Sequence, residues 1–430
     1  MAQIYGTKKK SRFRFKANCK KLARLLFNPR IILPPILALA CLVAALSMLA
    51  VKLSSLEPVD MMTNFTNGGV WDDAFELNDI LTNVRMIRTL KVFSPRCLVF
   101  DYGSQVLFVG QVDGTVLGIE KDQYGRVGMG EIKLVSSYPG YIISLRISMG
   151  MLYVGDADHG IYIIELSSMK RIMAMELHEV NPPVKSLMDF TIGTGGLLYV
   201  VDSSSKYSAR TYMHQFLEGS CTGRLFRFSP VSKRVINMKD GLCMPTSVEA
   251  TFSEDGLLIS ESGRGRFIVW DIDNTTVRSE TYLPGIPGRI RLNRRGGYWM
   301  TMQAVNHGFV KYVNDRPWLR KVFCFLLPER ILWGLAFTPH HAAVDLHTNG
   351  TVMASLQDQY GKNNDRITDI AEAENEVLFF GNDNQNFMGG LGDPQPQFDP
   401  KSFGMEDAPK PSDKGSSDKD PKEQETKQGL

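Results

Sequence analysis

Leu198-Tyr199-Val200-Val201-Asp202 and Gly223-Arg224-Leu225-Phe226-Arg227-Phe228 are the two stretches that decide the fold. Both are short and rich in aliphatic and aromatic residues, and turn residues flank them, so they predict neighbouring strands of an antiparallel sheet. The segment between them opens with the polar run Asp202-Ser203-Ser204-Ser205-Lys206. It predicts a long exposed excursion, and loops of this kind often carry binding sites.

The same apolar pattern recurs along the chain, and its spacing predicts the architecture. Similar clusters begin at Leu107, Leu152, Leu198, Leu257, Tyr298 and Leu378. Their starts are separated by 45, 46, 59, 41 and 80 residues. Repeats of roughly 40–50 residues built from short strands are typical of propeller blades. We therefore expect an all-β fold, a six-bladed β-propeller over residues 85–390.

The last spacing is long because residues 303–339 interrupt the rhythm with an apolar, partly helical segment. Its centre, Trp318 to Leu327, mixes aromatic and aliphatic residues with Arg and Lys. Three interpretations stay open: ordinary core packing, a lid over one mouth of the propeller, or a patch that contacts a nearby membrane.

The N-terminal charge pattern predicts a membrane topology. Residues 1–30 hold ten Lys or Arg and no Asp or Glu, and residues 31–51 carry no charge. A helix of 21 residues would reach roughly 31 Å, enough to cross a bilayer core. Because the apolar core of a cleaved signal peptide is usually about 7–15 residues, we expect an uncleaved transmembrane signal-anchor.

The basic tail before this span should stay cytosolic, which makes the chain a single-pass type II membrane protein of the plasma membrane or an endomembrane. Residues 52–84 then form a stalk, and residues 391–430, rich in Pro, Asp, Lys and Ser, form a disordered tail. The remaining middle of the chain is weakly acidic, which argues against nucleic acid as a partner.

Sequons and cysteines agree with a luminal or extracellular propeller. Acceptor triplets for N-glycosylation begin at Asn64, Asn274 and Asn349, all beyond the span. Four cysteines would meet an oxidising compartment: Cys97, Cys221, Cys243 and Cys324. They allow three pairings, or they stay buried thiols, and the spacing does not choose between these alternatives.

Several local motifs resemble the strictosidine synthase-like family of type II membrane propellers. They are residues 199–206, Gly223-Arg224-Leu225, Met244-Pro245, Pro284-Gly285-Ile286-Pro287, Gly296-Gly297-Tyr298-Trp299 and Arg316-Pro317-Trp318. The resemblance covers residues 85–387 and implies arylesterase-like or lactonase-like hydrolysis, with a calcium ion in the central channel. In that family a Glu and Asn or Asp residues from different blades hold the ion.

The positions that match those calcium ligands hold Arg96, Lys185, Thr246 and Gly288 in this sequence. Calcium requires hard oxygen donors, which two cations, a hydroxyl and a glycine do not supply. We therefore expect no metal site, no cofactor and no catalytic residue. Calcium would return as a cofactor only if the hydrolase alternative holds.

Cationic residues at the channel suggest a different use. Arg96, Lys185 and Arg289 could bind a carboxylate, sulfate or phosphate, or they could instead pair with acids such as Glu249 and Asp189. The expected function is a glycosylated, membrane-tethered, noncatalytic binding or adhesion module, with a protein partner or a small anionic ligand. The alternative is an arylesterase-like or lactonase-like hydrolase of the same family.

Overall fold

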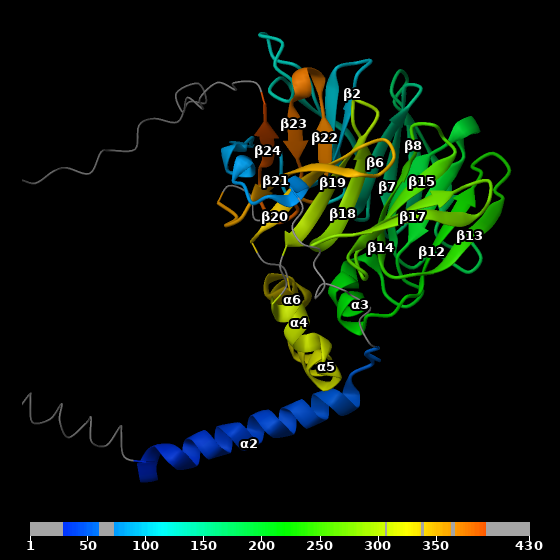
Figure 1. The fold of residues 1–430 in the computed structure, drawn as a ribbon. Helices are drawn as coiled ribbons and strands as arrows, with labels where there is room; N and C mark the ends of the chain where they lie inside the picture. Colours follow the sequence, from blue (N-terminus) through cyan, green and yellow to red (C-terminus); the bar gives the residue numbers. More distant parts are fainter. Residues whose placement is uncertain (1–28, 60–72, 306–307, 337–338, 363–365, 393–430) are drawn as a thin grey trace, which may run out of the picture. The chain divides into compact units, whose positions relative to one another are not determined.

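The computed structural model describes residues 29–59, 73–305, 308–336, 339–362 and 366–392 (Figure 1). In this part of the chain the strands form six antiparallel sheets of four strands each. The first three sheets consist of β2 (Pro95–Asp101), β3 (Val106–Gln111), β4 (Thr115–Ile119) and β5 (Ile132–Ser137); β6 (Ile142–Ser148), β7 (Met151–Asp156), β8 (Gly160–Glu165) and β9 (Lys170–Glu176); and β10 (Leu187–Ile192), β11 (Leu198–Asp202), β12 (Gly223–Phe228) and β13 (Val235–Leu242).

The other three sheets follow the same order. They consist of β14 (Pro245–Ala250), β15 (Gly256–Glu261), β16 (Arg266–Asp271) and β17 (Thr276–Tyr282); β18 (Gly285–Leu292), β19 (Tyr298–Val305), β20 (His341–Leu346) and β21 (Val352–Asp358); and β22 (Ile370–Glu372), β23 (Leu378–Phe380), β24 (Met388–Leu391) and β1 (Arg85–Ile87). The first strands of successive sheets contact one another in turn, and β22 returns to β2, so the sheets close into a ring.

The predicted six-bladed β-propeller is confirmed. Each of the six apolar clusters falls on the second strand of a blade: β3, β7, β11, β15, β19 and β23. These strands are almost wholly buried because each blade packs between two neighbours, as the burial of Leu152, Val154 and Val200 illustrates. Continuous apolar runs rather than strict alternation are therefore what the fold requires.

Ring closure joins the two ends of the propeller. The N-terminal strand β1 pairs with β24, with Arg85 opposite Gly390 and Ile87 opposite Met388. The last blade is thus built from both ends of the domain. This arrangement removes the open edge at which an unclosed ring would expose unpaired backbone groups.

The helices are few and most lie at connections between strands. They are α2 (Pro29–Leu53), α3 (Tyr212–Glu218), α4 (Gly308–Asn314), α5 (Pro317–Leu326) and α6 (Glu329–Ala336), with 3-10 turns η2 (Asp73–Phe75), η3 (Ile80–Asn83), η4 (Thr194–Gly196), η5 (Ala209–Thr211) and η6 (Glu374–Glu376). Figure 1 shows α3 and α4–α6 at the same end of the propeller. The expected helical interruption after residue 303 is confirmed as α4–α6.

The excursion between β11 and β12 differs from the prediction. The two strands pair as expected, with Leu198 opposite Phe228 and Asp202 opposite Arg224. Their connection, however, is not an exposed loop, because α3 buries Met213, Phe216 and Leu217 beneath α5 and α6. A polar start to the segment concealed the apolar helix that follows it.

The N-terminal region is described in part. In the described residues, no helix is both long enough and apolar enough to cross a membrane. The described side chains of α2 are nonetheless largely apolar and exposed, with Leu39 at 60% and Met48 at 65%. Part of the expected stalk packs on the propeller, since Asn78 Nδ2 donates to the Ser355 carbonyl at 2.8 Å. The predicted disordered tail lies outside the described residues from 393 onward.

Candidate functional site

A narrow pocket lies at the mouth of the central channel, where the first strands of the blades begin. Its lining comes from five of the six blades and from α6: Arg96, Met188, Thr246, Gly288, Arg289, Gln303, Trp333, Arg366, Thr368 and Asp383. The cavity volume of ≈ 10 Å³ is about what one water molecule requires. A larger ligand therefore needs the lining to move.

Four of the residues singled out from the sequence meet at this pocket. Arg96 on β2, Thr246 on β14, and Gly288 and Arg289 on β18 all line it. Lys185 does not, because its side chain is exposed on the connection that precedes β10. Met188, three residues further along, lines the pocket for that blade.

The rim of the pocket carries two arginines on one carboxylate. Arg96 Nη1 donates to Asp383 Oδ2 at 2.5 Å, and Arg366 Nη2 donates to the other oxygen of the same group. Arg96 also donates to the hydroxyl of Tyr141. Burial would raise the pKa of Asp383, but Arg366 and Arg96 outweigh burial and lower it. The rim therefore keeps a surplus of positive charge.

Three polar atoms at this rim are buried and have no hydrogen-bond partner. They are Arg96 Nε, Arg366 Nε and Gln303 Oε1. A buried donor without a partner costs about 1–3 kcal/mol, so such atoms indicate where water or a ligand would bind. Two of the three atoms are N–H donors of guanidinium groups, so an anion is the favoured ligand.

A second ionic network lies deeper on the axis, around the buried carboxylate of Asp189 on β10. Three guanidinium groups form ion pairs with it: Arg146 at 3.2 Å, Arg289 at 3.1 Å and Arg291 at 3.0 Å. Burial alone would raise the pKa of Asp189, but these groups, Arg146 first among them, hold it well below its usual range.

The network extends to two further acids and balances its charge. Arg291 Nη2 lies 2.9 Å from Asp369 Oδ2, and Arg146 Nη2 lies 3.3 Å from Glu249 Oε2. Three arginines thus face three carboxylates, including the Asp189 and Glu249 named from the sequence as partners. Arg289 forms an ion pair with Asp189, one of these two acids. Pairing offsets the cost of burying these charges, although Arg146 Nε and Arg291 Nε have no hydrogen-bond partner.

Arg289 also donates to the backbone at the centre of the ring. Its Nη1 donates to the Met188 carbonyl at 2.5 Å and its Nη2 to the Ile143 carbonyl at 2.6 Å. Burial is the main reason that the pKa of Arg289 is lowered. Its guanidinium group occupies the position on the axis toward which carbonyl oxygens of two blades point.

The residues present do not fit the calcium ion that the resemblance implies. A Cβ placed on Gly288 would lie 2.3 Å from Thr301 Oγ1, so no donor side chain has room there. The Thr246 hydroxyl is already bonded to Ser260 and Ser262 at 2.9 Å each. Two guanidinium groups about 5 Å from a dication would oppose it by several kcal/mol even at an effective dielectric near 20. Across the described ranges, no three His, Cys, Asp or Glu side chains gather in a metal-binding arrangement.

The helical segment α4–α6 covers the mouth, as the lid interpretation predicts. Trp333 of α6 lines the pocket and stacks on Tyr212 of α3 with a centroid distance of 5.0 Å and an interplanar angle of 8°. The guanidinium group of Arg366 lies over the Trp333 ring, 4.5 Å from its centroid. The lid is therefore held by aromatic and cation–π contacts.

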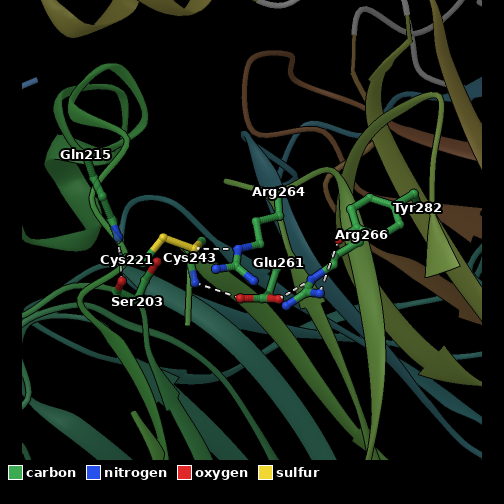
Figure 2. The surroundings of a disulfide bond; sticks show 8 residues. All are labelled: Ser203, Gln215, Cys221, Cys243, Glu261, Arg264, Arg266 and Tyr282. Atoms are coloured by element: carbon green, nitrogen blue, oxygen red, sulfur yellow. Dashed lines mark hydrogen bonds and ion pairs between the residues drawn. A yellow bond between two sulfur atoms is a disulfide. The ribbon is translucent and has the colours of Figure 1, made fainter. Parts of the chain in front are cut away.

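A disulfide ties the end of the α3 segment to the connection between β13 and β14. Among the described cysteines, Cys221 pairs with Cys243, while Cys97 and Cys324 are buried thiols and Cys41 is an exposed one. Figure 2 shows the bond beside Arg264, whose Nε lies 3.0 Å from Cys243 Sγ. The Cys243 amide donates to Glu261 at 2.7 Å. The sequence left open three ways of pairing these four cysteines, or four buried thiols. The structure has one disulfide and two buried thiols.

Two of the three expected glycosylation sites lie on exposed turns. Asn274 lies between β16 and β17, and Asn349 lies between β20 and β21. Asn64 lies outside the described residues. Both described turns are sterically open to modification.

Fold and site together define a six-bladed propeller with an arginine-rich axial pocket beneath a helical lid. A sequence model of the family described as strictosidine synthase matches residues 188–271. Adipocyte plasma membrane-associated protein from Bos taurus is 32% identical over 289 residues, covering 62% of this chain and 68% of that protein. Strictosidine synthase-like 13 of Arabidopsis thaliana is 24% identical and covers 50% of this chain and 54% of that protein. The chain belongs to the strictosidine synthase-like family.

Similarity to a solved structure supports the fold but not the function. A gluconolactonase from Xanthomonas campestris superimposes with a TM-score of 0.50 at 11% identity, covering 79% of this chain and 96% of that structure. Similarity at this level of identity shows a common propeller architecture. The names of the relatives also associate this family with the plasma membrane.

Proposed function

We propose that this protein is a noncatalytic binding module that lacks the calcium site of its hydrolytic relatives. The observation that carries the proposal is the position of Arg289, which donates to the Met188 and Ile143 carbonyls and forms an ion pair with Asp189. A metal-assisted hydrolase needs that position for a cation that polarises a carbonyl. A guanidinium group there is fixed and has no open coordination site.

The ligand that suits the pocket is a small anion such as a carboxylate, sulfate or phosphate. Arg96 and Arg366 place two cations on the single carboxylate of Asp383, and each keeps an unpartnered Nε–H. Arg289 contributes a third cation to the lining. Arg96 and Arg289 were expected from the sequence, whereas Lys185 is exposed and is not part of the proposed site.

The module is further proposed to be glycosylated and tethered to a membrane in type II orientation. The exposed apolar side chains of α2, the ten basic residues among residues 1–30 and the membrane association in the relatives' names support the tether. The Cys221–Cys243 disulfide and the exposed Asn274 and Asn349 turns fit a luminal or extracellular propeller. Extraction of cell membranes with alkaline carbonate tests the tether, and the chain should remain in the membrane pellet.

Esterase and lactonase assays test the noncatalytic assignment. The full chain in detergent is assayed on phenyl acetate and on a lactone, with calcium and with chelator. We expect no calcium-dependent turnover and no thermal stabilisation by calcium, because the axis offers no set of oxygen donors. Calcium-dependent turnover would establish the hydrolase alternative instead.

Thermal unfolding with acetate, sulfate and phosphate tests the anion site. A ligand at 100 times its Kd stabilises the folded state by about 2.7 kcal/mol, which raises the melting temperature measurably. Arg366→Gln should abolish this increase. Arg295→Gln, which alters an exposed arginine paired with Asp345, is the matched control and should retain it. Equal responses in both variants would contradict the site.

A further inference from the structure

The helical lid is apolar on two opposite sides. Its inner side packs into the core through Val313, Cys324 and Leu332. Its outer side exposes six large apolar side chains, each at 43–55%: Tyr312, Trp318, Phe325, Leu326, Ile331 and Leu335. We refer to these six residues as the insert face. Monomeric soluble proteins seldom expose apolar side chains in such a group unless a partner covers it.

Basic residues accompany the insert face. Arg330 is exposed, and Arg316 and Lys321 are half-buried with long aliphatic stems. The acids in this segment are Asp315, which is exposed, and Glu329, which is bonded to His214 at 2.8 Å. Aromatic and aliphatic side chains flanked by Arg and Lys suit the boundary between lipid headgroups and acyl chains.

The insert face continues onto α2. The C-terminal part of α2 contacts α5, where Ala50 is buried. The segment that follows α2 is bonded to the lid, since Arg320 Nη1 donates to the Val59 carbonyl at 2.9 Å. The Val59 amide in turn donates to the Glu218 carbonyl of α3, also at 2.9 Å. The lid and the end of α2 are therefore held together as one surface.

The two exposed sequons lie at the other end of the propeller. Antiparallel strands alternate in direction, so connections between second and third strands lie at one end and those between third and fourth strands at the other. The lid joins β19 to β20, a second and a third strand, whereas Asn274 and Asn349 follow third strands. Glycans at these turns would point away from the insert face.

We propose that the insert face lies on the surface of a phospholipid bilayer. The inference rests on the proposed membrane tether and adds that the lid itself enters the interface. Continuity with α2 favours a bilayer over a protein partner, as do the flanking basic residues, whose aliphatic stems can lie on the apolar layer while their charges reach the headgroups. The axial pocket beneath Trp333 then opens toward the membrane.

Quenching of Trp318 fluorescence tests the inference. The full chain is reconstituted into vesicles of phosphatidylcholine and phosphatidylserine in which part of the phosphatidylcholine carries bromine near the headgroup end of its chains. Bromine quenches tryptophan only at contact range. We expect brominated vesicles to quench a component of the emission that disappears in Trp318→Phe, and the double variant Phe325→Ser with Leu335→Ser to weaken it.

The matched control places a reporter at the opposite end of the propeller. Phe252 is 69% exposed on the turn between β14 and β15. Phe252→Trp in the Trp318→Phe background should show no added quenching. Flotation of the chain with the vesicles without Trp318 quenching overturns this inference and leaves the tether standing. A chain that fails to float with the vesicles overturns both the membrane tether and the contact of the insert face with the bilayer. Equal quenching at residues 252 and 318 overturns the contact of the insert face.

Discussion

At the scale of the residue, the decisive group is the carboxylate of Asp189. Besides three guanidinium groups, it accepts hydrogen bonds from the hydroxyls of Ser144 and Ser247, each at 2.5 Å. These donors come from β6, β14 and β18, so one side chain of β10 links four blades. The channel centre is therefore stabilised by charge pairing.

Asp189→Asn should destabilise the protein by about 3–5 kcal/mol, because it leaves buried guanidinium groups without a compensating charge. The free energy of unfolding in urea measures the loss. Asp273→Asn, at an exposed turn residue, is the control and should change stability by less than about 0.5 kcal/mol. Equal effects of the two variants would contradict a structural role for the network.

The dependence of stability on acid pH should report on the carboxylate of Asp189. Since the pKa of Asp189 is lowered in the folded state, its contribution to stability is present above the unfolded pKa of about 3.9 and is lost as pH falls below it. Unfolding free energies measured from neutral pH downward should therefore fall less steeply in Asp189→Asn than in the wild type below about pH 4. Parallel curves would mean that Asp189 titrates normally.

At the scale of the element, ring closure depends on a strand of three residues. In β1, Ile87 is buried against the last blade whereas its neighbour Met86 is 43% exposed. The two side chains point to opposite sides of one strand. Substitutions at Ile87 and Met86 can therefore distinguish the contribution of side-chain burial to ring closure from that of backbone pairing.

Ile87→Ala should cost about 2–5 kcal/mol because it leaves a cavity in the closing blade. Met86→Ala keeps the same backbone pairing and should cost less than about 0.5 kcal/mol. Thermal and urea unfolding of both variants measure the difference. A similar cost for both would show that backbone pairing, and not burial of Ile87, secures the closure.

The disulfide acts at the same scale, since it ties the end of the α3 segment to the connection between β13 and β14. It closes a loop with a sequence separation of 22 residues. Cys221→Ser should therefore lower stability by about 3 kcal/mol, in line with loop closure in the unfolded chain. Reductant should lower the stability of the wild type to that of Cys221→Ser and leave that variant unchanged. Cys41→Ser, which removes a thiol outside the disulfide, is the control and should be as stable as the wild type.

At the scale of the whole molecule, the propeller has two different ends. One carries the axial pocket, the lid and the contact with α2, and the other carries the exposed sequon turns. This asymmetry suits a protein that faces a membrane with its binding site and faces solvent with its glycans. Sugar at these turns would also oppose docking of that end on a bilayer.

Asn274→Gln and Asn349→Gln should each remove one glycan from the chain expressed in animal cells. Each variant should migrate faster in gel electrophoresis by one step, and endoglycosidase treatment should abolish the differences. Glycosylation at these turns requires the propeller to enter the secretory lumen. A chain that carries no glycan at either position would contradict the proposed orientation.

Local pattern in the sequence was sufficient for the blades. The six apolar clusters predicted six blades, and each cluster forms the second strand of its sheet because a strand packed between two neighbours must be continuously apolar. Arg96, Thr246, Gly288 and Arg289, which the sequence singled out, line one pocket. The excursion before Gly223 was predicted wrongly, because its polar opening hid the helix that buries Phe216.

Only the tertiary structure decided which charges meet. Arg146, Arg291, Arg366 and Asp383 were not foreseen as site residues, although an arginine within an apolar strand, such as Arg146, was a signal that could have found one. Arg146 and Asp189 lie on different blades and 43 residues apart, whereas Arg366 and Asp383 flank two strands of one blade and are 17 residues apart. Blade formation depends on neighbours in sequence, whereas the pairing of charges and the Cys221–Cys243 bond depend on how separate segments pack together. The pairing of β1 with β24 depends on ring closure, which brings the two ends of the domain into contact.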